Sequence, residues 1–304
     1  MYKIGCKIDE VRTDGSLNAL KRDLEYFKKI DMEAVEIPVH GLDAIKNGVL
    51  DKNRVKKIKE ILKDFDFEYS VHSPNPLNLM DVQNPDMHFS VFRASLEFAV
   101  HVGAKILVYH CGRFITEETF HVHTGKKALF GADKKKLLEK EGRSLGFLSK
   151  EFPDVTICLE NARPYLHHSP YCYAERPEEL KGQLERINRE NVRMTLDVGH
   201  LNMASIFYGF DLLEAVQSIR SWVAHVHMHD NFGGAVYHYE KQQTHQIPFG
   251  RGDSHMPVGW GAIPMRAVCS MLPPDYSGMF IMELRSRYFE HTGESRDNLL
   301  SVLT

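Results

Sequence analysis

The sequence lacks the features that mark membrane and secreted proteins. No apolar run approaches the ~20 residues that a helix needs to span a bilayer. Residues 2–8 have the pattern of a strand and do not form the apolar core of a signal peptide. The five cysteines are scattered and form no CxxC pair, so we interpret them as reduced thiols that fill small apolar spaces. We therefore expect a soluble cytoplasmic protein with no membrane partner.

An excess of charge of one sign is missing as well. The 38 Lys and Arg nearly balance the 41 Asp and Glu, which leaves a formal net charge of -3. No global basic field therefore draws the chain to nucleic acid. A local patch or bound metal cations could still do so, and nucleic acid remains a disfavoured alternative partner.

No glycine-rich phosphate-binding turn follows the first expected strand, and no linker or shift in composition divides the chain. Instead, apolar runs of strand type alternate with amphipathic helices. The expected strands are 2–8, 34–37, 67–72, 105–110, 155–160, 193–197, 223–230 and 279–284. The expected helices are 17–30, 55–62, 92–102, 134–151, one that opens at 177, 212–219, 267–272 and 295–303. This order favours a parallel sheet with crossover helices, and its length fits an α/β fold with a single (β/α)8 TIM-barrel domain over residues 1–304. A doubly wound open sheet is the alternative.

Acids and histidines recur where the expected strands end. Asp197 ends one strand, and His200 follows it past a glycine. In a TIM barrel such strand ends meet at one face, where the active site lies. The residues predicted there are His72, His110, Glu160, Asp197, His200, His227 and Glu283, with Asp253 and His255 from a long polar loop. On the strand at 223–230, three histidines share one face, so at least one should reach a ligand near the rim.

Each of these residues has an ordinary structural interpretation. A histidine at a strand end commonly makes a hydrogen bond in the core or at the surface, and an acid there commonly caps a helix. Together, nine such side chains at one end of a barrel would be costly without a compensating cation. The sequence therefore predicts a divalent metal site of one to three ions, and mixed His and carboxylate donors suit Zn, Mn, Co or Fe.

Seven short motifs resemble a known family. They are Val71-His72-Ser73-Pro74, Val108-Tyr109-His110-Cys111-Gly112, Cys158-Leu159-Glu160-Asn161, Leu196-Asp197-Val198-Gly199-His200, His227-Met228-His229-Asp230-Asn231, Asp253-Ser254-His255 with Gly259 and Gly261, and Met282-Glu283-Leu284. Over essentially its whole length the chain resembles the xylose isomerase-like TIM barrel superfamily. That superfamily contains sugar and sugar phosphate isomerases and epimerases, and also DNA repair enzymes of the endonuclease IV type.

The resemblance implies three sets of metal ligands. The set shared across the superfamily corresponds to Glu160, Asp197, His227 and Glu283. A second metal, bridged by Glu160, would add His72 and His110. A third would use His200, Asp253 and His255, so every position of the trinuclear endonuclease pattern has a candidate. Members of the isomerase type keep many of the same residues, so the ligands alone do not decide the chemistry.

The first hypothesis is a metal-dependent isomerase or epimerase of a sugar, sugar phosphate or related polyol. Glu160 and Glu283 would exchange the substrate proton as base and acid. Arg163 and Arg285, together with Arg287, could hold a phosphate or carboxylate, and each of the three could equally be a salt-bridge partner at the rim. Trp260 could contact a sugar face.

The alternative is a multinuclear-metal phosphoesterase that cleaves abasic DNA. Its ligands fit, but the loop at 39–45 contains an acid and no arginine, and the loop at 75–79 lacks an aromatic residue to enter the duplex. The sequence Glu36-Ile37-Pro38 resembles the sugar enzymes, which favours the isomerase. A barrel that binds without catalysis ranks last, because no ligand position is missing. The segment 232–250 is interpreted as a lid or as a subunit contact in a homo-oligomer, and both alternatives stay open.

Overall fold

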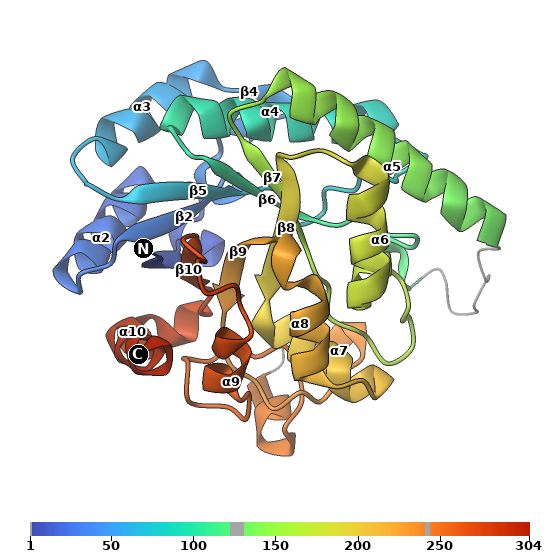
Figure 1. The fold of residues 1–304 in the computed structure, drawn as a ribbon. Coiled ribbons are helices and arrows are strands. Elements are labelled where there is room, and N and C mark those ends of the chain that lie inside the picture. The colour runs from blue at the N-terminus through green and yellow to red at the C-terminus, as the bar shows by residue number, and fades with distance from the viewer. Residues whose placement is uncertain (1, 122–130, 241–243) are drawn as a thin grey trace.

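A closed parallel barrel forms the centre of the molecule. The computed structural model describes residues 2–121, 131–240 and 244–304, so parts of the expected loops at 114–130 and 232–250 lie outside the described residues. Within these ranges, eight strands close in the order β1-β10-β9-β8-β7-β6-β5-β2 (Figure 1). They are β1 Lys3–Lys7, β2 Ala34–Pro38, β5 Glu68–His72, β6 Ile106–His110, β7 Thr156–Glu160, β8 Val192–Asp197, β9 Val223–Met228 and β10 Met279–Met282. The predicted (β/α)8 barrel is confirmed.

The helices lie around the outside of this barrel (Figure 1). They are α1 Glu10–Thr13, α2 Leu17–Lys29, α3 Lys52–Leu62, α4 Pro85–Val102, α5 Gly131–Glu151, α6 Pro177–Ile187, α7 Val198–Tyr208, α8 Leu212–Ile219, α9 Met265–Ser270 and α10 Thr292–Leu303. Local signals set several of their ends. The Ser16 side chain caps α2, and Gly103 in the left-handed region closes α4. No helix in the described ranges is long and apolar enough to cross a membrane.

Several observed elements have no counterpart among those expected. The short helix α1 and the helix α7 are two of them. Residues 198–205 of α7 are all buried, so this part of the helix has no exposed face and the amphipathic period is missing. A short hairpin, β3 Ile45–Lys46 with β4 Val49–Leu50, follows β2. Its turn is Asn47-Gly48, with φ of 50° and 77°, which is the sequence preferred for a two-residue turn with positive φ.

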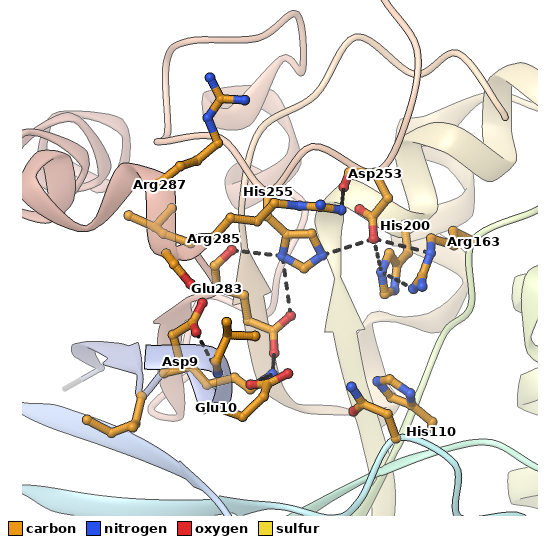
Figure 2. A pocket seen from close by; sticks show the side chains of 16 residues that line it. Asp9, Glu10, His110, Arg163, His200, Asp253, His255, Glu283, Arg285 and Arg287 are labelled. Atoms are coloured by element: carbon orange, nitrogen blue, oxygen red, sulfur yellow. Dashed lines mark hydrogen bonds and ion pairs between the residues drawn. The ribbon is translucent and has the colours of Figure 1, made fainter. Parts of the chain in front are cut away.

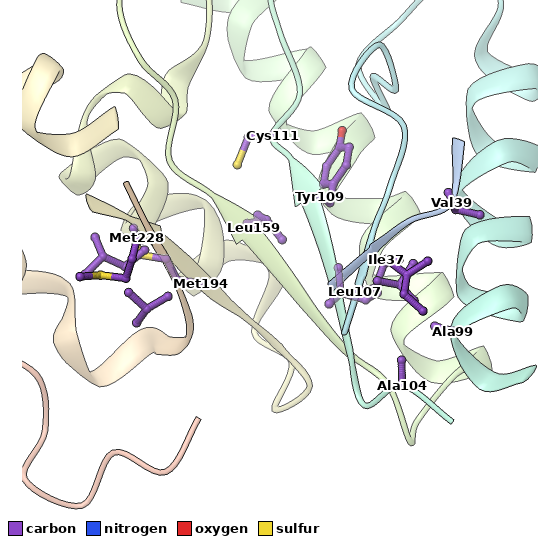
Figure 3. Close-up of a cluster of buried hydrophobic side chains, with 14 of the residues drawn as sticks. Ile37, Val39, Ala99, Ala104, Leu107, Tyr109, Cys111, Leu159, Met194 and Met228 are labelled. Atoms are coloured by element: carbon purple, nitrogen blue, oxygen red, sulfur yellow. The ribbon is translucent and has the colours of Figure 1, made fainter. Parts of the chain in front are cut away.

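The barrel has an apolar core on both faces of its strands. Leu107, Leu159 and Met194 belong to the large core that the strands and the surrounding helices share (Figure 3). Inside the barrel a smaller cluster closes its base, and it consists of Ala34, Ile106, Val108, Cys158, Met279 and Ile281. We call this cluster the basal plug. The buried Ser70 and His225 lie level with it, because Ser70 pairs with Ile106 and His225 pairs with Met279.

The pairing of the strands brings the polar residues to one level. Between β6 and β7, Val108 pairs with Cys158 of the basal plug, and two residues later His110 pairs with Glu160. Between β8 and β9, Asp197 pairs with His227. Because alternate residues face the same side, the polar residues extend the interior column toward the carboxyl ends. The strand ends therefore meet as expected.

Candidate metal centre

All nine predicted ligands lie together at the carboxyl end of the barrel. Their donor atoms form three adjacent groups, and within each group the atoms lie within 4.8 Å of one another. The central group is Glu160, Asp197, His227 and Glu283. The second group is His72, His110 and Glu160. The third group is His200, Asp253 and His255, joined by His229, which the sequence analysis did not assign.

Glu160 connects the central and second groups. Its Oε2 lies 3.0 Å from His110 Nε2 and 3.5 Å from His72 Nε2. Its Oε1 lies 3.2 Å from His227 Nδ1. The carboxylate is buried, and its two oxygens face different sets of imidazoles. This is the geometry that a bridging ligand requires.

Buried ligand atoms without hydrogen bonds test whether these residues fit a cation. Among the described residues, His72 Nε2, Glu160 Oε2 and Asp253 Oδ1 are buried and make no hydrogen bond. Such atoms are costly unless another partner satisfies them. Two of them are carboxylate oxygens, and burial lowers the pKa of His110 to about 4, which leaves its imidazole neutral and able to bind a metal. The donor set therefore fits a divalent cation.

Backbone carbonyls orient three of the histidines. The contacts are His72 Nδ1 to Ser73 O at 2.7 Å, His200 Nδ1 to Asn161 O at 3.0 Å, and His255 Nδ1 to Glu283 O at 2.8 Å. A carbonyl can only accept, so we assign the proton to Nδ1 in each ring, which leaves Nε2 with a lone pair toward the groups. His110 differs, because its Nδ1 faces the Arg113 guanidinium at 3.5 Å.

His227 is held the opposite way, by a carboxylate below it. Its Nε2 lies 3.0 Å from Glu36 Oε1, and its Nδ1 faces the central group. Glu36 Oε2 also accepts from Ser70 Oγ and lies 2.9 Å from His225 Nε2. Burial would raise the pKa of Glu36, but the imidazoles of His227 and His225 hold it well below its ordinary value. In the sequence, Glu36 was noted only as part of a motif that resembles the sugar enzymes. A single acid within an otherwise apolar strand could have indicated that it contacts a buried basic side chain.

Asp197 places the third group through α7. It ends β8 and caps α7, and its side chain accepts from His200 N at 2.6 Å. His229 Nε2 lies 3.1 Å from the same oxygen of Asp197. Gly199 leaves room for that ring, because a Cβ there would lie 2.0 Å from His229 Cε1. In the Asp-Val-Gly-His motif, Asp197 thus ends β8 and caps α7, and His200 supplies a candidate metal ligand.

Two basic side chains contact the groups from opposite sides. Lys7, which the sequence analysis did not assign, ends β1 and lies 3.0 Å from Glu283 Oε1. Burial would raise the pKa of Glu283, but Lys7 and then His227 lower it below its ordinary value. On the other side, Arg163 Nε lies 3.2 Å from Asp253 Oδ2. Both contacts join residues far apart in the chain.

A cavity of about 450 Å³ opens onto the groups (Figure 2). Of the predicted substrate-binding residues, Arg163 and Arg285 line it, as does Arg287. The Arg285 guanidinium also donates to Asp253 O. Trp260 does not line this cavity: its indole donates to Glu294 Oε1 at 2.8 Å, so its contact with a substrate stays a prediction.

Aromatic side chains join the loop after β7 to the long segment 232–250. Phe120 stacks on His168 with ring centroids 3.9 Å apart, and His238 packs against Phe120 and Tyr165. The same segment leaves Phe249 exposed. The packing anchors part of the segment beside the loop that carries Arg163. A role as a lid or as a subunit contact stays a prediction.

Known proteins resemble this chain in sequence and in fold. The model of the xylose isomerase-like TIM barrel family matches residues 24–302. An uncharacterized protein of Methanocaldococcus jannaschii is 27% identical over 274 residues, which cover 89% of this chain and 90% of that protein. The crystal structure of a D-tagatose 3-epimerase-like protein superposes with a TM-score of 0.72 at 20% identity, covering 99% of this chain and 98% of that one. A D-psicose 3-epimerase with D-tagatose, from Clostridium cellulolyticum H10, gives 0.68 at 15% identity and covers 99% of each chain. At these identities the two structures demonstrate a shared fold.

Proposed function

The chain belongs to the xylose isomerase-like TIM barrel family, and from this premise we propose that it is a metal-dependent isomerase or epimerase of a sugar, sugar phosphate or related polyol. We assign the activity to one domain of residues 1–304. One observation carries the proposal: two glutamates, at the ends of β7 and β10, face the same imidazole. Oε1 of Glu160 and Oε1 of Glu283 lie 3.2 and 3.6 Å from His227 Nδ1.

The central group would hold the metal ion. When bound, a divalent metal there supplies a Lewis acid that polarises two neighbouring oxygens of the substrate. One of the two glutamates, Glu160 or Glu283, then takes the proton from the substrate carbon, and the other returns a proton to the product. The Lys7 ammonium lowers the pKa of Glu283 and keeps its carboxylate ionised. His227 stays fixed between them because Glu36 holds its far nitrogen.

An anionic substituent on the substrate fits the cavity. Three arginines line it, and Arg287 is exposed at its rim. A phosphate or carboxylate would accept hydrogen bonds from guanidinium groups while the carbon skeleton reaches the central group. The names of two solved neighbours, a D-tagatose 3-epimerase-like protein and a D-psicose 3-epimerase, support a carbohydrate as the substrate class.

The direct test is exchange of the substrate proton with solvent. The metal-loaded protein is incubated in D2O with a panel of ketoses, aldoses and their phosphates, and NMR follows both deuterium entry and the new isomer. We expect Glu160→Gln and Glu283→Gln each to lower the rate by roughly 10²–10⁴-fold. Glu185→Gln, an exposed change outside the cavity, is the control. Full exchange in a folded, metal-loaded Glu283→Gln protein would refute the proton-transfer roles.

A second candidate function is phosphoester hydrolysis by several metals, and the three adjacent donor groups favour it. Two or three cations spaced along these groups would generate hydroxide and stabilise a leaving oxygen. The assay is cleavage of an aryl phosphodiester and of a duplex with one abasic site. Cleavage with no sugar exchange would replace the first proposal by this one.

A further inference from the structure

Arg163 enters the third group as a cation would. Its Nε lies 3.2 Å from Asp253 Oδ2, and its Nη1 lies 3.2 Å from His200 Nε2. The same Asp253 oxygen is approached by His255 Nε2 at 2.9 Å and by His200 Nε2 at 3.4 Å. Figure 2 shows the guanidinium beside these side chains. One positive group therefore contacts two of the four donor residues.

The contact with His200 occupies the ring nitrogen that a metal would need. The Asn161 carbonyl oxygen accepts from Nδ1 of His200, so Nε2 is the nitrogen that faces the group. Nη1 of Arg163 lies 3.2 Å from that Nε2. A metal ion bound by His200 and Asp253 would have to displace this guanidinium and then lie beside its charge.

Both the main chain and the side chain of Arg163 make fixed contacts. Tyr171 Oη donates to the backbone carbonyl oxygen of Arg163 at 3.2 Å, and the guanidinium lies 5.5 Å from the Tyr165 ring centroid. Only 17% of the Arg163 side chain is exposed. Moving it out would break the ion pair with Asp253 and leave that buried carboxylate without its cation.

Lys7 does not block the central group in the same way. Its ammonium contacts Glu283 but none of the other three donor residues of that group. In the described ranges, neither Glu160 nor Asp197 forms an ion pair with a lysine or an arginine. The two cations thus differ: Lys7 lies beside a metal group, whereas Arg163 joins two of its members.

We propose that the Arg163 guanidinium is the resident cation of the third group, in place of a metal ion. The inference rests on the proposed function, because an isomerase needs a metal in the central group and none in the third. It makes a trinuclear site unavailable to the unmodified chain. It also gives the cavity a fixed positive charge that chelators do not remove.

The experiment counts bound zinc by elemental analysis after the purified, untagged chain is stripped, reloaded and dialysed. The variants are Arg163→Met, Asp253→Asn and the double change, with Arg287→Met as the matched control because it removes an exposed cavity arginine that contacts no donor. We expect Arg163→Met to bind about one more zinc per chain than the unmodified chain, and the double variant to lose that gain. Asp253→Asn alone and Arg287→Met leave the count unchanged.

Two results would overturn the inference. One is a loss of about one zinc on Asp253→Asn in the otherwise unmodified chain, because the third group would then already hold a metal. The other is a folded Arg163→Met protein that gains none. If Arg163→Met does not fold, Asp253→Asn decides the matter alone. The proton exchange assay fails or succeeds separately, so a protein with these counts and no exchange would refute the proposed function and leave the inference standing.

Discussion

Replacing Glu36 by Gln should weaken metal binding although Glu36 contacts no metal ligand atom that faces the central group. Glu36 Oε1 now lies 3.0 Å from His227 Nε2, and Glu36 Oε2 lies 2.9 Å from His225 Nε2. A glutamine offers one accepting oxygen and one donating nitrogen. If the nitrogen faces His227, the ring must carry its proton on Nδ1, and the ligand lone pair is lost.

The size of the effect follows from this loss of orientation. Removing an outer partner of a metal-binding histidine typically costs 10- to 100-fold in affinity, which is about 1.4 to 2.7 kcal/mol. We expect a value toward the upper limit, because Glu36 is fully buried and water cannot replace it as the acceptor. The Ser70 hydroxyl, which donates to Glu36 Oε2 at 2.9 Å, should matter much less.

The assay is competition for Co²⁺ or Zn²⁺ with a chromophoric chelator. Glu175→Gln is the control for burying an amide, because Glu175 is equally buried and contacts no donor residue. Ser70→Ala removes the hydroxyl that donates to Glu36 Oε2 and should change the metal affinity much less. A folded Glu36→Gln protein with unchanged metal affinity would show that Glu36 does not orient His227. It would also refute the assignment of the His227 proton to Nε2.

Three further predictions follow from contacts around the groups. Lys7→Met removes the ammonium that lowers the pKa of Glu283, so that pKa should rise. As the pH falls, the variant should then lose metal binding at a higher pH than the unmodified chain. Titrations of metal affinity against pH test this, and identical curves for the two proteins would contradict it. Removing the metal with a chelator should lower the melting temperature by several degrees, because a metal at ~100 times its dissociation constant adds about 2.7 kcal/mol to the free energy of unfolding. Calorimetry with and without chelator measures this shift. An unchanged midpoint would argue against a structural contribution of the metal. Gly199→Ala should destabilise the chain by ~1–3 kcal/mol in urea unfolding, because the new Cβ overlaps the His229 ring; an unchanged midpoint would mean that this ring moves freely.

Sequence pattern was enough to locate the strands, because each buried strand is bounded by turn residues or by a polar ligand. It also predicted that Asp197 and His227 meet, since the carboxyl ends of parallel strands share one face. It missed α7 because a helix buried on all sides has no apolar stripe. In the chain as a whole, periodicity detected those elements that have one buried and one exposed face.

Contacts between distant residues were beyond such patterns. Lys7 looks like an ordinary strand end until β1 pairs with β10 and brings it to Glu283. Arg163 was assigned to the substrate, and its ion pair with Asp253 depends on where a loop far along the chain returns. His229 follows the last residue of β9, so strand parity indicated its face but not its group.

The basal plug limits how substrate and product can enter and leave the barrel. With apolar side chains filling the base, the described cavity opens at the carboxyl end, on the side of Arg287 and Glu10. Substrate and product therefore enter and leave through the same opening, at the carboxyl end of the barrel. A proposed isomerase built this way cannot pass its product through the molecule, so product must leave before the next substrate enters. Accumulating product would then compete with substrate for the same cavity.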